Sequence, residues 1–212
     1  SVHGFGLHLG TTEEGPYYPL RSPYPRSKKR AEEEVLAANA PGFRTVVLRP
    51  ADVYGPGDTI TFYRLLAAQE RGVKGTLGGG RKLTSVVYIE DLVQAVVLAL
   101  ESEASAGQVF NISGGERVSW AELMAYTASL LGVRPWLGMP LPPAWALAFL
   151  LSGIYSLLRI RRDPPLTPYR VGHVAWDFDF SIEKARRLLG YAPQIGWREG
   201  LRRTVEAYRA GE

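Results

Sequence analysis

Residues 45–58 read TVVLRPADVYGPGD and join a short apolar strand to a loop rich in proline and glycine. The β-branched run at 45–48 is typical of a strand that a parallel sheet buries on both faces. Helical patterns stand on either side of it. Residues 25–40 carry an apolar stripe at helical spacing and end before Pro41, and residues 61–71 are expected to form a second helix. The stretch therefore predicts a helix–strand–helix unit.

The alternation continues further along the chain. Short strands are expected at 85–88 and 109–112, with a helix at 92–100 between them for which Asp91 is the expected N-cap. Residues 1–23 are rich in Gly, Pro and Tyr and are expected to form a loop. Together these patterns predict an α/β fold built on a doubly wound parallel sheet.

The chain divides into two regions by composition. After Pro135 the sequence becomes mostly helical and is interrupted by prolines. We therefore place a second, smaller region at 113–212, interleaved with the first at 1–112. Within it, Ser119 followed by Glu122 predicts a capping box at the start of a helix.

Composition limits the function classes. The 212 residues are 46% hydrophobic and 22% charged, as in ordinary globular proteins, and none is cysteine. Disulfides, thiolate metal sites and cysteine nucleophiles are therefore excluded. The net charge is +4 and the arginines are scattered, so no nucleic-acid partner is implied. His3, His8 and His173 are too dispersed in sequence to predict a metal site, and each is interpreted as a surface or packing residue.

A phenol and an ammonium stand four residues apart in Tyr24-Pro25-Arg26-Ser27-Lys28, on one face of the expected helix. Pro25 disfavours the α conformation for Tyr24, which is therefore expected at the helix entry rather than inside it. A free phenol has a pKa near ~10, and a neighbouring ammonium lowers it by stabilising the phenolate. Such a pair can exchange a proton with an alcohol or a carbonyl oxygen. The alternative is a surface tyrosine that packs on a lysine stem.

Eight motifs occur in order along the chain: SVHG at 1–4, YPRSKKRAEEEVL at 24–36, LRPADVYGPGD at 48–58, VVYIEDLVQAVVLAL at 86–100, VFNISGGERVSW at 109–120, LTPYRV at 166–171, FDFSIEKARRLLGYAP at 178–193 and GLRRTVEAY at 200–208. In this order they resemble the C-terminal part of an extended short-chain dehydrogenase of the NAD-dependent epimerase/dehydratase superfamily. Several of them are particularly similar to the 3β-hydroxysteroid dehydrogenase/isomerase branch.

The resemblance implies a Rossmann-like sheet. Residues 1–112 would be the C-terminal part of the dinucleotide-binding domain, and residues 113–212 mainly the substrate-binding region. It implies that Tyr24 is the catalytic acid/base and that Lys28 lowers the pKa of Tyr24 and binds the nicotinamide ribose. The loop after the first strand would contact NAD or NADP, largely through its backbone, at Pro50, Ala51 and Val53. A turn that holds no ligand is the alternative for this loop.

The implied activity is the interconversion of a secondary alcohol and a ketone. A nucleotide-sugar epimerase or dehydratase would use the same pair, and a non-catalytic dinucleotide-sensing or assembly module is the third reading. Epimerases of this superfamily carry a diphosphate-binding Arg where this chain has Thr84, although Arg81 is close in sequence. The helix at 25–40 is where members commonly dimerise, so a homodimer is expected.

This chain differs from the superfamily at the Gly-rich loop that binds the dinucleotide. No G-x-x-G-x-x-G segment is present, and Gly78-Gly79-Gly80 does not replace it, because it neither follows an N-terminal strand nor opens a long helix. The superfamily's catalytic Ser or Thr would lie about two positions before Ser1. We therefore expect a fragment or truncated form that is weakly active or inactive as given.

The most apolar stretch is WALAFLLSGIYSLL at 145–158, which is followed by an arginine cluster. It is shorter than the ~20 residues of a membrane-spanning helix. One interpretation is that residues 145–162 wall an apolar pocket and touch a membrane surface. The other is an ordinary buried or dimer-interface helix. Both favour a small hydrophobic substrate, steroid-, polyprenoid- or fatty-like, in a cytoplasmic protein with or without membrane association.

Two groups of acidic residues are interpreted as structural. Glu32-Glu33-Glu34 lies close to Lys28-Lys29-Arg30 and is read as a solvated helix face with favourable pairing. Asp177 and Asp179 flank Phe178 in an expected turn or strand.

Overall fold

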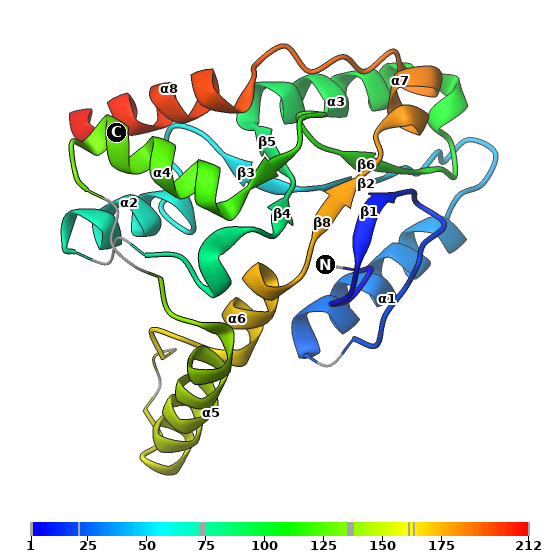
Figure 1. The fold of residues 1–212 in the computed structure, drawn as a ribbon. Coiled ribbons are helices and arrows are strands. Elements are labelled where there is room, and N and C mark those ends of the chain that lie inside the picture. The colour runs from blue at the N-terminus through cyan, green and yellow to red at the C-terminus, as the bar shows by residue number, and fades with distance from the viewer. Residues whose placement is uncertain are drawn as a thin grey trace.

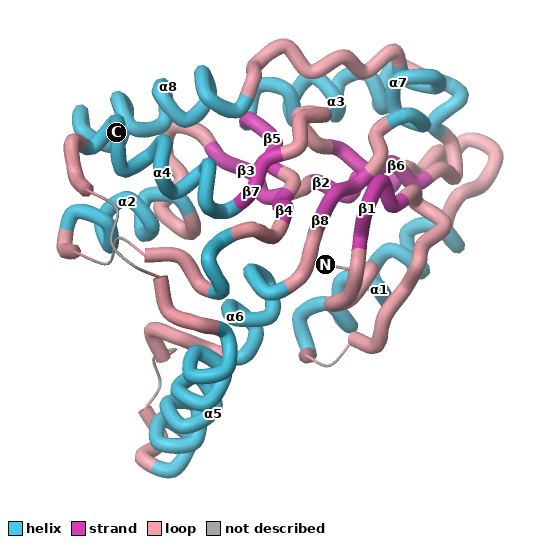
Figure 2. Tube along the Cα trace, in the orientation of Figure 1, coloured by secondary structure: helices cyan, strands magenta, loops and turns pink. Residues whose placement is uncertain are grey.

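The computed structural model describes residues 2–20, 22–72, 75–134, 138–160, 162 and 164–211. Pairs of parallel strands form its centre (Figure 2). β2 (Val47–Pro50) pairs with β6 (Val109–Ile112), and β3 (Asp52–Tyr54) pairs with β5 (Val86–Tyr88). β2, β5 and β6 are the apolar runs that the sequence singled out, although β2 begins two residues later than expected. β3 lies in the segment that was expected to be a loop, so that expectation is wrong at residues 52–54. The predicted α/β class is confirmed.

Two further strand pairs join distant parts of the chain. β1 (His8–Thr11) is parallel to β8 (Phe178–Phe180), and β4 (Leu83–Thr84) is antiparallel to β7 (Val118–Ser119). The prediction of a loop throughout residues 1–23 is wrong at β1, whose partner strand lies near the other end of the chain and leaves no local pattern. Two 3-10 turns complete the short elements: η1 (Gly78–Gly80) and η2 (Glu103–Ser105).

Helices cover the strands on both sides (Figure 1). α3 (Ile89–Glu101), α7 (Glu183–Leu189) and α8 (Trp197–Ala210) form one layer, and α1 (Pro23–Ala37) lies against β2 on the other side. The core between the strands and the first layer is built from buried apolar side chains: Val87, Ala95, Phe110, Ile112 and Leu189. This burial is the main force that holds the layers together.

A second core lies among α2 (Phe62–Glu70), α4 (Trp120–Leu131) and α8. It is filled by large buried side chains: Tyr54, Phe62, Leu123, Trp197 and Leu201. α8 comes so close to β3 at Gly200 that a Cβ there would lie 2.4 Å from the Tyr54 hydroxyl oxygen. The capping box at the start of α4 is present, as predicted.

The Asp91 side chain does not cap the helix in which it lies, contrary to the sequence prediction. α3 begins at Ile89, so Asp91 stands within its first turn. Its carboxylate accepts hydrogen bonds from the backbone N–H groups of Gln194 at 2.7 Å and Ile195 at 3.1 Å. Asp91 therefore fixes the loop before α8 to α3.

α5 (Leu141–Leu157) and α6 (Pro168–Ala175) pack on each other and project away from the strands (Figure 1). One side of α5 is exposed, for example at Leu157. Within the described ranges, no helix combines the length and the apolar character that crossing a membrane requires. The contact of residues 145–162 with a membrane surface, the homodimer and the boundary between the two sequence regions stay predictions.

Candidate active site

A cleft of about 790 Å³ lies between the start of α1, the segment that follows β2, and the α5–α6 pair. Parallel α/β sheets bind ligands beyond the carboxyl ends of their strands, and β2 ends here at Pro50. Four of the residues that the sequence singled out line the cleft: Tyr24, Pro50, Ala51 and Val53. The fifth, Lys28, is not among the lining residues.

Tyr24 and Lys28 lie on the same side of α1. The helix begins at Pro23, so Tyr24 is inside the first turn and not at the entry where it was expected. Prolines are tolerated in this turn because its N–H groups have no partner within the helix. Lys28 Nζ lies 5.7 Å from the centre of the Tyr24 ring, and the tyrosine side chain is 55% exposed. The structure thus places Tyr24 at the cleft wall with Lys28 beside it on the helix, while the roles assigned to the two residues stay predictions.

A buried ion pair fixes α1 to β2. Arg49 Nε and Nη2 donate to the two Glu32 oxygens at 2.8 and 2.7 Å, and Arg49 also donates to the Glu13 carbonyl and the Tyr17 hydroxyl. Burial disfavours both charges, but the hydrogen bonds and the opposite charges outweigh it. They hold the pKa of Glu32 below its ordinary value and raise the pKa of Arg49. The reading of residues 32–34 as a solvated face is wrong at Glu32.

A histidine–carboxylate pair lies in the same cleft and was missed by sequence reasoning. His173 Nε2 lies 2.8 Å from Asp52 Oδ2, and the Thr84 hydroxyl donates to the same oxygen at 3.2 Å. Burial opposes ionisation of both partners, but their mutual attraction raises the pKa of His173 and lowers that of Asp52. The packing interpretation of His173 holds, because its ring stacks on Phe178 and Tyr169, but it missed the contact with Asp52. No local pattern marks this pair, because its members are 121 residues apart.

His3 and His8 are buried side by side, with ring centres 5.6 Å apart. Both rings contact Phe180, and Phe178 stacks on His8 and on His173 at 5.4 Å. Burial and the charge of Arg49 lower the pKa of His3 to about 4, and burial lowers the pKa of His8. The packing interpretation is confirmed for these two histidines.

Aromatic side chains make up much of the remaining lining. Tyr169 of α6 stands edge-on to Tyr24 and parallel to His173, with ring centres 6.5 Å apart in both pairs. Further apolar surface comes from α5, from the residue after α6 and from the segment at residue 5: Trp145, Phe149, Trp176 and Phe5. Such a surface suits the apolar body of a ligand.

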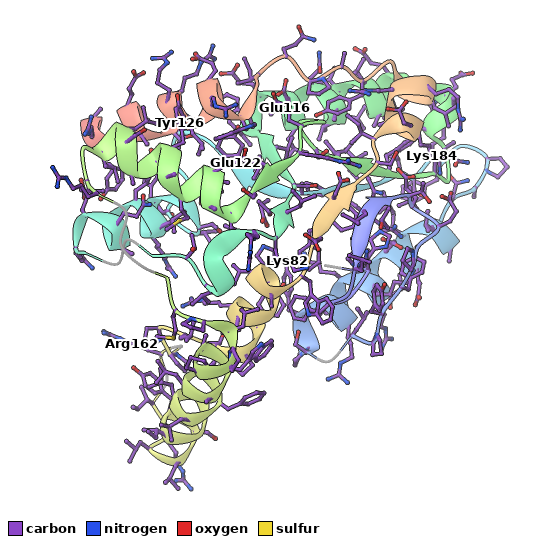
Figure 3. All side chains as sticks on the ribbon, in the orientation of Figure 1. Lys82, Glu116, Glu122, Tyr126, Arg162 and Lys184 are labelled. Carbon is purple, nitrogen blue, oxygen red and sulfur yellow. The ribbon has the colours of Figure 1, made fainter. Side chains whose placement is uncertain are left out.

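No lysine or arginine is among the lining residues in the part of the chain that the structure describes. Lys82 lies beside α6 (Figure 3), but its amine binds Asp177 at 2.8 Å. Arg117 likewise binds Asp179 at 2.9 Å, so the structural reading of both aspartates is confirmed. Arg81 does not line the cleft.

The residues present fit one end of a nicotinamide dinucleotide. Residues 50–53 line the same cleft as Tyr24. The sequence offers no Gly-rich turn for a pyrophosphate. Gly80 of η1 serves packing instead, because a Cβ there would lie 2.8 Å from the Ala121 amide nitrogen. The contact of Pro50, Ala51 and Val53 with such a cofactor stays a prediction.

Parallel strands between helical layers, with a cleft beyond the end of β2, define a Rossmann-like α/β protein. Residues 5–113 match the model of the NAD dependent epimerase/dehydratase family, and the chain belongs to that family. It is 34% identical over 208 residues to 2-alkyl-3-oxoalkanoate reductase of Stenotrophomonas maltophilia, covering 95% of this chain and 62% of that protein. It is 32% identical over 221 residues to 3beta-hydroxysteroid-dehydrogenase/decarboxylase isoform 1 of Arabidopsis thaliana, covering 98% and 50%. The chain therefore spans between half and two thirds of the length of these relatives.

Solved structures have the same fold. MoeE5 in complex with UDP-glucuronic acid and NAD is 28% identical, with a TM-score of 0.72 over 100% of this chain and 64% of that one. The UDP-glucose 4-epimerase of Thermotoga maritima is 25% identical, with a TM-score of 0.70 over 99% and 60%. These similarities confirm the predicted Rossmann-like fold.

Proposed function

We propose that the protein is an NAD(P)-dependent short-chain dehydrogenase/reductase that interconverts a secondary alcohol and a ketone on a hydrophobic substrate. The observation that carries this proposal is Tyr24 at the wall of a cleft lined largely by aromatic side chains, with Lys28 beside it on the same helix. When bound, the nicotinamide would supply or accept the hydride.

The chain's own residues would handle the proton and the geometry. The Tyr24 hydroxyl would donate its proton to the ketone oxygen during reduction, and the Tyr24 phenolate would accept the proton of the alcohol during oxidation. The ammonium of Lys28 lies 5.7 Å from the centre of the Tyr24 ring and would bind the nicotinamide ribose. Pro50, Ala51 and Val53 would hold the nicotinamide ring beside it.

The names of relatives support ketone chemistry on apolar substrates. One is the 2-alkyl-3-oxoalkanoate reductase described above. Another is the sterol-4-alpha-carboxylate 3-dehydrogenase of Mus musculus, 32% identical over 195 residues. A third is a farnesyl-dihydroquinoline-oxide ketoreductase of Stigmatella aurantiaca, 30% identical over 190 residues.

A nucleotide-sugar epimerase or dehydratase is the second candidate, because MoeE5 and the Thermotoga epimerase share the fold at 25% identity or more. Against it, no Lys or Arg lines the described cleft to bind a diphosphate. Thr84, at the position where epimerases carry an arginine, donates its hydroxyl to Asp52 instead.

The test uses the complete coding sequence, unsubstituted and with Tyr24→Phe, and follows net NAD(P)H consumption with a hydrophobic ketone and with UDP-glucose. We expect consumption with the ketone alone and a loss of roughly 10²–10⁴-fold in the variant. Unchanged turnover by the variant would contradict the assignment of Tyr24. Conversion of UDP-glucose without net NAD(P)H change would favour the epimerase.

A further inference from the structure

The His173–Asp52 pair has no part in the chemistry proposed above, although it lines the same cleft as Tyr24. Tyr169 links the two pairs, since its ring centre lies 6.5 Å from the ring centres of both Tyr24 and His173. A ligand that fills the cleft therefore meets both pairs.

One ring nitrogen of His173 has no hydrogen-bond partner among the described residues. Nε2 is occupied by Asp52, which fixes the ring, so this nitrogen is Nδ1. Nδ1 is also not a fully buried atom, and the side chain is 31% exposed. At Nδ1 a neutral ring presents a lone pair, whereas a protonated ring presents an N–H donor.

The charged groups around His173 decide whether its ring is neutral or protonated. Among the described residues that line the cleft, His173 is the one that can become a cation. Burial opposes protonation, but the charge and hydrogen bond of Asp52 outweigh it and raise the pKa of His173. The protonated form, with a donor at Nδ1, therefore persists to higher pH than in a free histidine.

The other titratable groups near His173 do not compete for its charge. Tyr24 and Tyr169 carry phenols, and α5, which packs on α6, has no charged side chain between Leu141 and Leu157. On β8 and beside it, the aspartates at 177 and 179 are paired with Lys82 and Arg117.

From this geometry we propose that His173, held by Asp52, binds a carboxylate of the substrate, so that the cleft takes an amphipathic acid with an apolar chain. A carboxylate enters an apolar cleft at a high free-energy cost unless a charge-assisted hydrogen bond receives it. Nδ1–H supplies that bond on the side of the ring away from Asp52. Trp145, Phe149 and Trp176 receive the chain. The inference rests on the proposed function, because it assumes that the substrate oxygen that reacts lies beside Tyr24 at the other end of the cleft.

The test is a binding experiment that needs neither cofactor nor turnover. Octanoate and octanamide have the same chain, but only octanoate carries a charge. Both are titrated into the protein near pH 6.5 while the histidine ring signals are followed by NMR. The chain has three histidines, so loss of one signal in His173→Gln assigns it. We expect octanoate to shift the His173 signal and to bind roughly ten-fold more tightly than octanamide, the size of one charge-assisted hydrogen bond.

Three variants distinguish a hydrogen bond from His173 to the octanoate carboxylate from a general electrostatic attraction of octanoate to the protein. His173→Gln should abolish the preference for octanoate, and Asp52→Asn should weaken it and lower the pH midpoint of the His173 signal. Lys82→Gln, which removes a positive charge near the cleft but outside its lining, should keep the preference. The fold of each variant is checked by circular dichroism.

Three results would overturn the inference: equal binding of the two probes, a preference that survives in a folded His173→Gln, or no effect of either probe on the His173 signal. Failure of the proposed function is distinguishable, because Tyr24→Phe should keep the octanoate preference while losing turnover.

Discussion

The Arg49 guanidinium donates two hydrogen bonds, of 2.8 and 2.7 Å, to the two oxygens of the Glu32 carboxylate. The two side chains are only 9% and 4% exposed, so the pair ties the helix that carries Tyr24 to β2 in a nearly dry environment. Removing one partner of such a pair leaves the other as an uncompensated buried charge.

Glu32→Gln should therefore lower the free energy of unfolding by about 3–5 kcal/mol. The measurement is urea unfolding followed by circular dichroism. Glu34→Gln is the matched control, because Glu34 pairs with Arg30 on the exposed face of the same helix and should change stability by less than about 0.5 kcal/mol. Equal effects of the two substitutions would refute the role given to the buried pair.

Lys28→Met tests the other half of the Tyr24 pair. The resemblance to short-chain dehydrogenases gives this ammonium a part in the reaction beside Tyr24, and we expect ketone reduction to slow by roughly 10²-fold when it is removed. Arg26→Met, which removes a positive charge one position after Pro25 on the same helix, is the control and should keep most of the activity. The assay is NAD(P)H consumption by the complete protein. If both variants lose activity equally, the loss comes from the reduced positive charge of the helix, and the role given to the Tyr24–Lys28 pair is contradicted.

The His173–Asp52 pair predicts a pH window of stability. The pKa of His173 is raised above 6.5, so its stabilisation is complete below that value and disappears as the pH rises through the raised pKa. The pKa of Asp52 is lowered below 3.8, so its stabilisation is complete above that value and disappears as the pH falls through the lowered pKa.

The stability difference between the native protein and His173→Gln should therefore be largest between about pH 4 and 6.5, at about 1 kcal/mol, and should shrink on both sides. Urea unfolding at several pH values measures it. The lowered pKa values of His3 and His8 affect both proteins equally and cancel in the difference. A difference that does not change with pH would show that the two groups do not share a charge.

Gly200→Ala tests the close approach of α8 to β3. The new Cβ would lie 2.4 Å from the Tyr54 hydroxyl oxygen, which forces helix or ring to move, and we expect a loss of about 1–3 kcal/mol. Gly153→Ala in α5 meets no atom within 4 Å and should be neutral or stabilising by up to about 1 kcal/mol, because alanine favours helix. Thermal unfolding compares the two, and a stable Gly200→Ala would contradict the packing described here.

The sequence predicted those features whose signals are local. Apolar runs marked β2, β5 and β6, and Ser119 with Glu122 marked the start of α4. The meeting of Tyr24 with the 50–53 segment followed from motif resemblance, and the structure places these residues in one cleft.

Features that depend on tertiary contacts could not be predicted in this way. Glu32 looked solvated because it stands in a run of three glutamates, yet its burial depends on Arg49, 17 residues further on. Asp91 stands where a helix cap is expected, but its carboxylate instead accepts hydrogen bonds from the backbone N–H groups of residues 194 and 195. The His173–Asp52 contact arises only when α6 folds against β3, and neither segment carries a pattern that points to the other.

The parallel pairing of β1 with β8 has a consequence for how the molecule comes apart. His8 lies opposite Phe178, so the first strand is completed only by a segment from the far end of the chain. The flanks that carry Tyr24 and His173 are thereby tied into one cooperative unit, and denaturation should proceed as a single transition for both. A polypeptide cut before residue 178 would lose the order of its own opening segment, so the cleft forms only once synthesis has passed that point.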